Sequence, residues 1–193
     1  MAPAQTSRAA SAARKSVLDQ LKDDHKRVKK AYKEFEKLNE EQGPEACEEI
    51  VGHVLDELSV HAAIEEEFLY PAARGEIEDD LIDEAEIEHE SMHQAIDRLR
   101  GMSPADEKYA ARFTVLCEYV LHHVKEEEGE IFPQLEKANI EWETLAQEMN
   151  ERRESLMQDT GSTAEVEDRS ENVRAGRRSA GDSARSAQAR HRS

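Results

Sequence analysis

The sequence predicts an all-α protein: an antiparallel up-down-up-down four-helix bundle with a short extra C-terminal helix and disordered tails. Apolar residues recur at steps of three and four over long stretches, which is the spacing of one helix face. Gly and Pro separate these stretches, and no two alternating segments joined by a short turn indicate a β-hairpin. Long amphipathic helices with short connections pack as an antiparallel bundle.

The first two expected helices are separated by a Gly-Pro pair. The first carries its apolar stripe over residues 17–38. Gly43 suits the position just past a helix end, and Pro44 suits the first turn of the next helix. The second helix is expected from Ala46, and Pro71 ends or kinks it, because proline lacks the backbone N–H that a helix interior needs.

The remaining helices follow the same pattern. The third is expected over residues 77–100, before a Gly-Met-Ser-Pro break. Ser103 is expected to cap the fourth helix with Pro104 in its first turn, and this helix runs to Phe132. Apolar residues over 135–149 predict a shorter fifth helix that packs on one end of the others.

Composition divides the chain into three parts. Residues 1–16 are rich in Ala, Ser and Arg and contain no acid. We expect them to form a disordered N-terminal tail, with an organelle transit peptide as the alternative. The helical domain is expected over 17–158. Residues 159–193 are expected to form a disordered Arg/Ser/Ala-rich tail, since they carry few large apolar residues.

Charge constrains the partners. The chain has a net charge of −18, and both ends are basic, which leaves about −26 for residues 17–171. This middle part attracts cations and repels nucleic acid, so nucleic-acid binding is conceivable only for the Arg-rich tail. No apolar run is long enough to span a membrane, and we expect no membrane partner. The sequence does not indicate an oligomeric state.

Cysteine usage indicates the compartment. The two cysteines, Cys47 and Cys117, are too few for a disulfide framework. They are expected to be small buried apolar residues in a reducing environment. The expected location is the cytoplasm.

An internal repeat carries the main functional signal. The segment His61-Ala-Ala-Ile-Glu65-Glu-Glu-Phe-Leu-Tyr-Pro is similar to His123-Val-Lys-Glu-Glu127-Glu-Gly-Glu-Ile-Phe-Pro. Residues four apart share a helix face, so each His and the Glu that follows it can reach one metal ion. The alignment leaves His122 without an equivalent His.

Two further helices add imidazoles. The third carries His89 and His93, one turn apart, and the first carries His25. Imidazole ligands suit zinc, copper, iron and nickel, and no cysteine falls at these spacings, which disfavours a structural zinc site. Five His and two Glu are too many ligands for one ion and about right for two.

Residues 17–133 therefore resemble a hemerythrin-like (HHE cation-binding) domain. The resemblance implies two Fe ions in an oxo- or hydroxo-bridged non-haem centre inside a four-helix bundle. The metal ligands that it implies are His25, His61, Glu65, His89, His93, His123 and one acid of the fourth helix. That acid is Glu127 at the fourth position after His123 or Glu128 at the fifth, and both remain open.

The resemblance implies a function in binding O₂ or a related small ligand, for storage, sensing or carriage. Redox chemistry of the same centre on peroxide or NO, including a catalase-like activity, is an alternative, and iron sensing or storage is another. The sequence does not decide whether the protein is an enzyme. Tyr70 is a candidate proton donor, and the candidates for an apolar wall round the site are Leu58, Ile64, Phe68, Val120, Val124 and Phe132.

Overall fold

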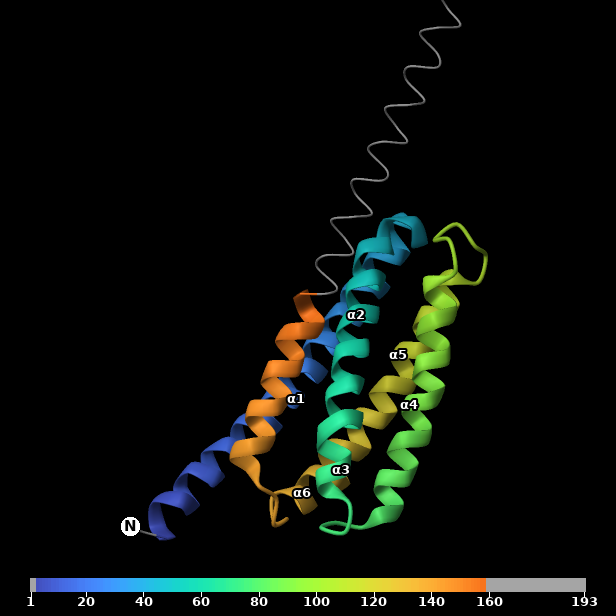
Figure 1. Ribbon diagram of the computed structural model, residues 1–193. Helices are drawn as coiled ribbons and strands as arrows, with labels where there is room; N and C mark the ends of the chain where they lie inside the picture. Colours follow the sequence, from blue (N-terminus) through green and yellow to red (C-terminus); the bar gives the residue numbers. More distant parts are fainter. Residues whose placement is uncertain (1–2, 159–193) are drawn as a thin grey trace, which may run out of the picture. The chain divides into compact units, whose positions relative to one another are not determined.

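The computed structural model describes residues 3–158, and all regular structure among them is helical (Figure 1). The tail expected over 159–193 lies outside the described residues. The four long helices are α1 (Pro3–Gln42), α2 (Glu48–Ile64), α4 (Asp79–Arg100) and α5 (Tyr109–Glu126). Each packs against two others, α1 on α2 and α5, and α4 on α5 and α2, which is the ring of a four-helix bundle. The predicted fold class is confirmed.

The first helix begins earlier than expected. We predicted a disordered tail over residues 1–16, but α1 starts at Pro3, so that prediction is wrong for residues 3–16. Ala and Arg favour helix, so the helix continues backwards from the apolar stripe of α1. Arg14 also donates a hydrogen bond to the backbone carbonyl of Glu136, which fixes this turn of α1.

The first connection matches its prediction. Gly43 ends α1 with φ of 86°, the left-handed conformation that glycine adopts readily. A short 3₁₀ turn, η1 (Pro44–Cys47), then leads into α2. The connection between α4 and α5 differs from its prediction, because α5 begins at Tyr109 rather than Pro104. The Ser103 N–H donates a hydrogen bond to the Asp106 carboxylate over 2.8 Å. This bond stabilises a turn before α5 begins.

Neither proline of the repeat ends its helix. After α2 comes a π-helical turn, η2 (Glu65–Leu69), and then α3 (Tyr70–Ala73). After α5 come an equivalent turn, η3 (Glu127–Ile131), and α6 (Phe132–Leu135). A π turn widens the helix and relieves the clash between a proline ring and the preceding carbonyls. Pro71 therefore does not end the helical segment, which continues to Ala73, and both π turns start at a glutamate of the repeat.

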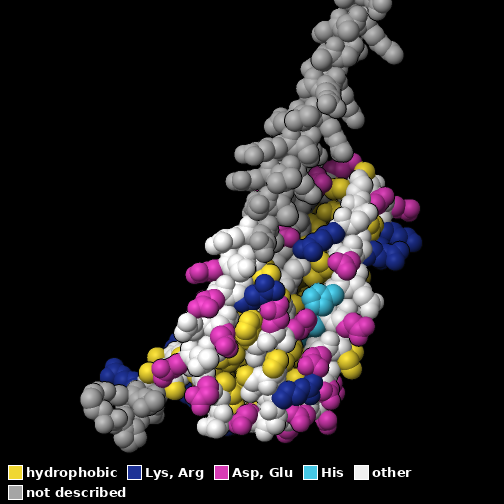
Figure 2. Space-filling view, viewed as in Figure 1, with side chains coloured by type: hydrophobic (Ala, Val, Ile, Leu, Met, Phe, Trp, Pro, Cys, Tyr) yellow, Lys and Arg dark blue, Asp and Glu magenta, His cyan; other side chains and the backbone are white. Residues whose placement is uncertain are grey.

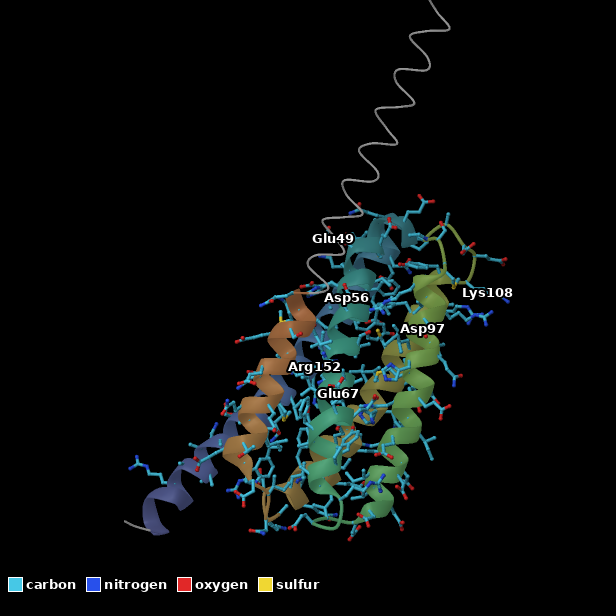
Figure 3. The ribbon with its side chains drawn as sticks, viewed as in Figure 1. Glu49, Asp56, Glu67, Asp97, Lys108 and Arg152 are labelled. Carbon is cyan, nitrogen blue, oxygen red and sulfur yellow. The ribbon has the colours of Figure 1, made fainter. Side chains whose placement is uncertain are left out.

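The fifth helix spans residues 142–158. Trp142, Leu145 and Met149 are buried on its inner side. Its polar residues contact α1 and η2: Gln20 donates to Asn150, and Arg152 donates two hydrogen bonds of 2.8 Å to Glu67, as can be followed in Figure 3. As far as Arg153, the helix thus lies along α1 as well as near one end of the bundle.

An apolar core fills one half of the bundle. The rings of Phe35 and Phe113 lie 4.5 Å apart between centroids, and Tyr32 packs edge-on against Phe113. Cys47 and Cys117 are buried and free, as predicted. No described helix is long and apolar enough to cross a membrane. Acidic side chains are spread over the face of the molecule seen in Figure 2.

Replacement of Phe113 by Ala should lower the free energy of unfolding by about 3–5 kcal/mol, because the fully buried ring leaves a cavity against Phe35. Urea denaturation measures this loss. Val115→Ala on the same helix is the control, since Val115 is 64% exposed. Equal effects of the two changes would contradict the core described above.

Candidate metal centre

Four imidazoles meet in the middle of the bundle, one from each long helix. His25 lies on α1, His61 on α2, His89 on α4 and His123 on α5, and all four are buried. The Nε2 atoms of His25 and His61 lie 3.3 Å apart. Those of His89 and His123 lie 3.1 Å apart. The site therefore contains two pairs of inward-facing nitrogen atoms.

Two buried carboxylates lie between these pairs. Glu65 Oε2 is 3.1 Å from the Nε2 atom of His61 and 3.6 Å from that of His89. Glu127 Oε2 is 3.3 Å from the Nε2 atom of His25 and 3.5 Å from that of His123. Each carboxylate thus reaches one imidazole of each pair, which is the placement of a group that bridges two ions.

Three of the four side-chain oxygen atoms of these carboxylates lack a hydrogen bond. Both side-chain oxygens of Glu65 and the Oε2 atom of Glu127 are buried without a hydrogen bond. A buried carboxylate without compensation is costly, and such groups are normally paired or bound to a metal. Donor atoms of His25, His61, Glu65 and Glu127 fall within 4.8 Å of one another, as do those of Glu65, His89 and His123. The two groups share Glu65, and together they fit a pair of cations.

The outer nitrogen of every imidazole is held by a carboxylate. The Nδ1 contacts are His25 with Glu128 at 2.9 Å, His61 with Asp24 at 3.2 Å, His89 with Glu66 at 2.9 Å, and His123 with Glu88 at 2.6 Å. An Nδ1–H that donates to a carboxylate leaves the Nε2 lone pair free, fixes the ring and makes it a stronger ligand. All four imidazoles are therefore prepared to bind a cation through Nε2.

The two acids that the sequence left open have different places. Glu127 is fully buried and lies between the imidazole pairs. The Glu128 side chain is 36% exposed, and its carboxylate contacts the outer nitrogen of His25. In the other repeat, Glu65 is likewise inside and Glu66 outside. The structure thus brings Glu127 into the cluster and gives Glu128 a positioning contact.

His93 is not brought to the cluster, although the resemblance implied it as a ligand. Its side chain is 41% exposed, and its Nε2 atom lies 2.8 Å from Glu66 Oε1. Lys29 occupies the equivalent place on α1, with Nζ 3.6 Å from Glu128 Oε1. The physical reason is position, because one helical turn beyond His89 the side chain reaches the outer side of Glu66.

Sequence reasoning missed the acids that support His61 and His123. Asp24 and Glu88 each directly precede the histidine of their own helix, yet each contacts a histidine of the neighbouring helix. An acid followed by His in both the first and the third helix was the signal that could have identified them. With these residues, the α1/α2 pair and the α4/α5 pair supply the same set of groups, so the site has an approximate two-fold repeat.

Burial and neighbouring carboxylates shift the pKa values of His61 and His123 in opposite directions. Burial lowers the pKa of His61, but the negative charge of Glu65 and the hydrogen bond to Asp24 outweigh it and raise this pKa well above its usual value. Burial also lowers the pKa of His123, and the charge of Glu127 again reverses the shift. Protons on these imidazoles neutralise the buried carboxylates, so metal binding here exchanges protons for cations.

Asp24, the acid that contacts His61, is itself ionised and paired with basic residues. Burial raises the pKa of Asp24, but its bond to His61 and the charges of His61 and Arg153 hold this pKa at about 2. Arg153 Nη2 donates to Asp24 Oδ2 over 2.6 Å, and Arg27 contacts the other oxygen. The fifth helix therefore stabilises one side of the site through Arg153.

Comparison with known proteins gives a family match. The family model described as "Hemerythrin HHE cation binding domain" matches residues 16–135. A curated protein described as a DNA nickase, from Nostoc sp. strain PCC 7120, is 27% identical over 117 residues. This alignment covers 61% of the chain and 32% of the relative, so the chain spans about a third of that protein's length. No solved structure matches.

Glu127→Gln should reduce the metal content of the purified protein, whereas Glu128→Gln should leave it near that of the parent. Glu127 is inside the cluster and Glu128 only positions His25. Metal analysis of both variants tests this assignment. A normal content for Glu127→Gln together with a loss for Glu128→Gln would reverse it.

His89→Ala should lower the metal content, and His93→Ala should retain it, because only His89 has an Nε2 atom in the cluster. Metal per chain, measured after identical purification, distinguishes the two variants. An equal loss in both would show that His93 reaches the ions.

Proposed function

Because the chain belongs to the hemerythrin HHE cation-binding family, we propose that it is a non-haem di-iron protein that binds O₂ or a related small ligand. Storage, sensing or carriage of that ligand is the proposed role. Support comes from the donor set: imidazoles with inward-facing Nε2 atoms and carboxylates placed between two pairs of them suit iron.

The proposed ligands are the six buried residues of the cluster: His25, His61, His89 and His123 through Nε2, with Glu65 and Glu127 bridging. The iron ions would supply the electrons for binding or reducing the small ligand. Four imidazoles and two carboxylates would provide fewer donor atoms than two six-coordinate ions accept, which would leave room for a ligand from solution.

A small cavity beside the imidazoles is the observation that supports the choice of ligand. Its volume is about 10 Å³, and His25, His61 and His123 are part of its lining. The rest of the lining is mixed: Asp24 and Glu57 are acidic, and Val28, Leu58, Met92, Val120 and Val124 are apolar. A space of this size holds about one water-sized molecule. It therefore favours a ligand of very few atoms, such as a diatomic molecule.

The expected apolar wall is only partly reproduced. Leu58, Val120 and Val124 line the cavity. Phe132 instead stacks on the ring of His25, with 5.9 Å between centroids. Ile64 and Phe68 are not part of the lining. The apolar residues that line the cavity thus lie mostly one helical turn from the imidazoles, on the side of the apolar core.

Tyr70 favours a second candidate function, redox chemistry on peroxide or NO. Its hydroxyl donates to Glu127 Oε1 over 3.1 Å and lies 3.2 Å from His89 Nε2. Burial and the charges of Glu127 and Glu65 raise the pKa of Tyr70 well above its usual value. The phenol therefore keeps its proton at the edge of the site, where it can donate it during reduction of a ligand.

DNA nicking, named for the cyanobacterial relative, is not included in the proposal. The chain spans about a third of that protein. Its middle part is strongly acidic, and phosphate backbones bind basic surfaces.

Iron analysis with optical spectra tests the proposal. The reduced, iron-loaded protein should contain two iron ions per chain and gain a charge-transfer band in air that disappears when oxygen is removed. An irreversible band would contradict O₂ carriage, and one iron per chain would contradict a di-iron centre.

Peroxide then separates the two candidates. Rapid gas evolution from peroxide that is lost in Tyr70→Phe would favour redox chemistry, because this change removes only the buried hydroxyl. Tyr119→Phe, on the half-buried outer side of α5, is the matched control. Slow peroxide decay in all three proteins would favour ligand binding.

A further inference from the structure

A second cavity lies beside the site, between α4 and η3. Its volume is about 50 Å³. Four glutamates that the site does not use as ligands are in its lining, Glu84, Glu88, Glu126 and Glu130. His123 and Glu127 of the buried cluster are also in the lining. The cavity thus connects acidic groups at the surface with groups of the metal centre.

These surface acids differ from their neighbours in having no Lys or Arg partner among the described residues. Asp83 and Glu86 flank Glu84 on α4, and both pair with Arg74. Within residues 3–158, neither Glu84 nor Glu130 forms an ion pair, and no Lys or Arg lines the cavity. Uncompensated negative charge round a hollow concentrates cations there.

Two further observations connect the cavity with cation binding. Glu127 lines the cavity and is fully buried, and its Oε2 atom, which has no hydrogen bond, faces the imidazoles of His25 and His123, so the cavity leads to the metal centre. Glu88, His122 and Glu126 have donor atoms within 4.8 Å of one another, with His122 Nε2 only 3.1 Å from Glu126 Oε1. Because Glu88 also contacts the Nδ1 atom of His123, this outer group is in direct contact with a residue of the buried cluster.

The approximate two-fold repeat provides an internal comparison. Gln20 of α1 corresponds to Glu84, and Phe68 of η2 corresponds to Glu130. Gln20 is bonded to Asn150 of the fifth helix, so this side is covered.

The acids beside the histidines differ in the same way. Asp24 corresponds to Glu88 but is neutralised by Arg27 and Arg153. For Glu88, among the residues that the structure describes, only His123 is a charged partner. One half of the site is thus closed and neutralised, whereas the other half stays acidic.

We propose that this acidic cavity is the route by which a divalent cation reaches the buried centre, and that Glu88 and Glu126 of its lining, together with His122 beside Glu126, form a transit site at its edge. The proposal rests on the metal centre described above. A cation that loses its water shell needs replacement oxygen and nitrogen atoms along its path, and these residues supply them at the surface. The buried cluster then offers more donors and retains the ion.

The rate of cobalt(II) uptake by the metal-free full-length protein tests the route. Cobalt bound to nitrogen and oxygen ligands absorbs visible light, so stopped-flow absorbance follows loading. Glu126→Gln combined with Glu130→Gln should slow uptake by about tenfold at low salt and leave cobalt per chain at saturation unchanged. Added NaCl should slow the parent and reduce its difference from the variant, because salt screens surface charge.

Glu45→Gln with Glu49→Gln is the matched control. It removes the same charge from exposed positions in η1 and α2, and Figure 3 labels Glu49 at the end of α2 remote from η2. This control should load at the parent rate. Equal slowing in both double variants, or none in the first, would overturn the route.

His122→Ala tests the transit site. It should slow uptake without changing cobalt per chain, whereas His123→Ala should lower cobalt per chain. Uptake of His122→Ala at the parent rate would overturn the transit site. A lower saturation in the double variant that combines Glu126→Gln and Glu130→Gln would overturn the route by making those acids part of the centre. A parent protein that binds no cobalt would instead contradict the metal centre itself.

Discussion

The burial of two carboxylates dominates this protein. Glu65 and Glu127 are fully buried, and three of their oxygen atoms have no hydrogen bond. Removing charged groups from water costs several kcal/mol each unless opposite charge is close. His61 and His123, whose pKa values are raised by these carboxylates, supply part of that compensation, and a cation held by the cluster would supply the rest. The positions of the helices therefore depend on the site as well as on the apolar core.

The site is also supported from outside. Each imidazole is held at Nδ1 by an acid, so ring orientation depends on a network of carboxylates rather than on packing alone. The π turns contribute, because each begins at a buried glutamate and lets the helix continue past a proline. Irregular helical turns of this kind are frequent at functional sites.

The two-fold repeat is broken by the fifth helix. Arg153 neutralises Asp24 on one side, whereas Glu88 on the other side has no basic neighbour of this kind among the described residues. A symmetric set of ligands is therefore placed in an asymmetric electrostatic environment. This asymmetry gives the two sides of the centre different access to solvent cations.

The sequence by itself determined the bundle, its helix order and four of the five histidines expected to face inward, because 3.6-residue periodicity and the His-x-x-x-Glu repeat are local properties. Only the tertiary structure placed Glu127 inside the cluster, Glu128 on the outer side of His25 and His93 outside the cluster. The places of Glu127 and Glu128 depend on a π turn, and that of His93 depends on distances between helices, neither of which sequence spacing specifies. The same reason hid the contacts of Asp24 and Glu88, since each acid supports a histidine on another helix.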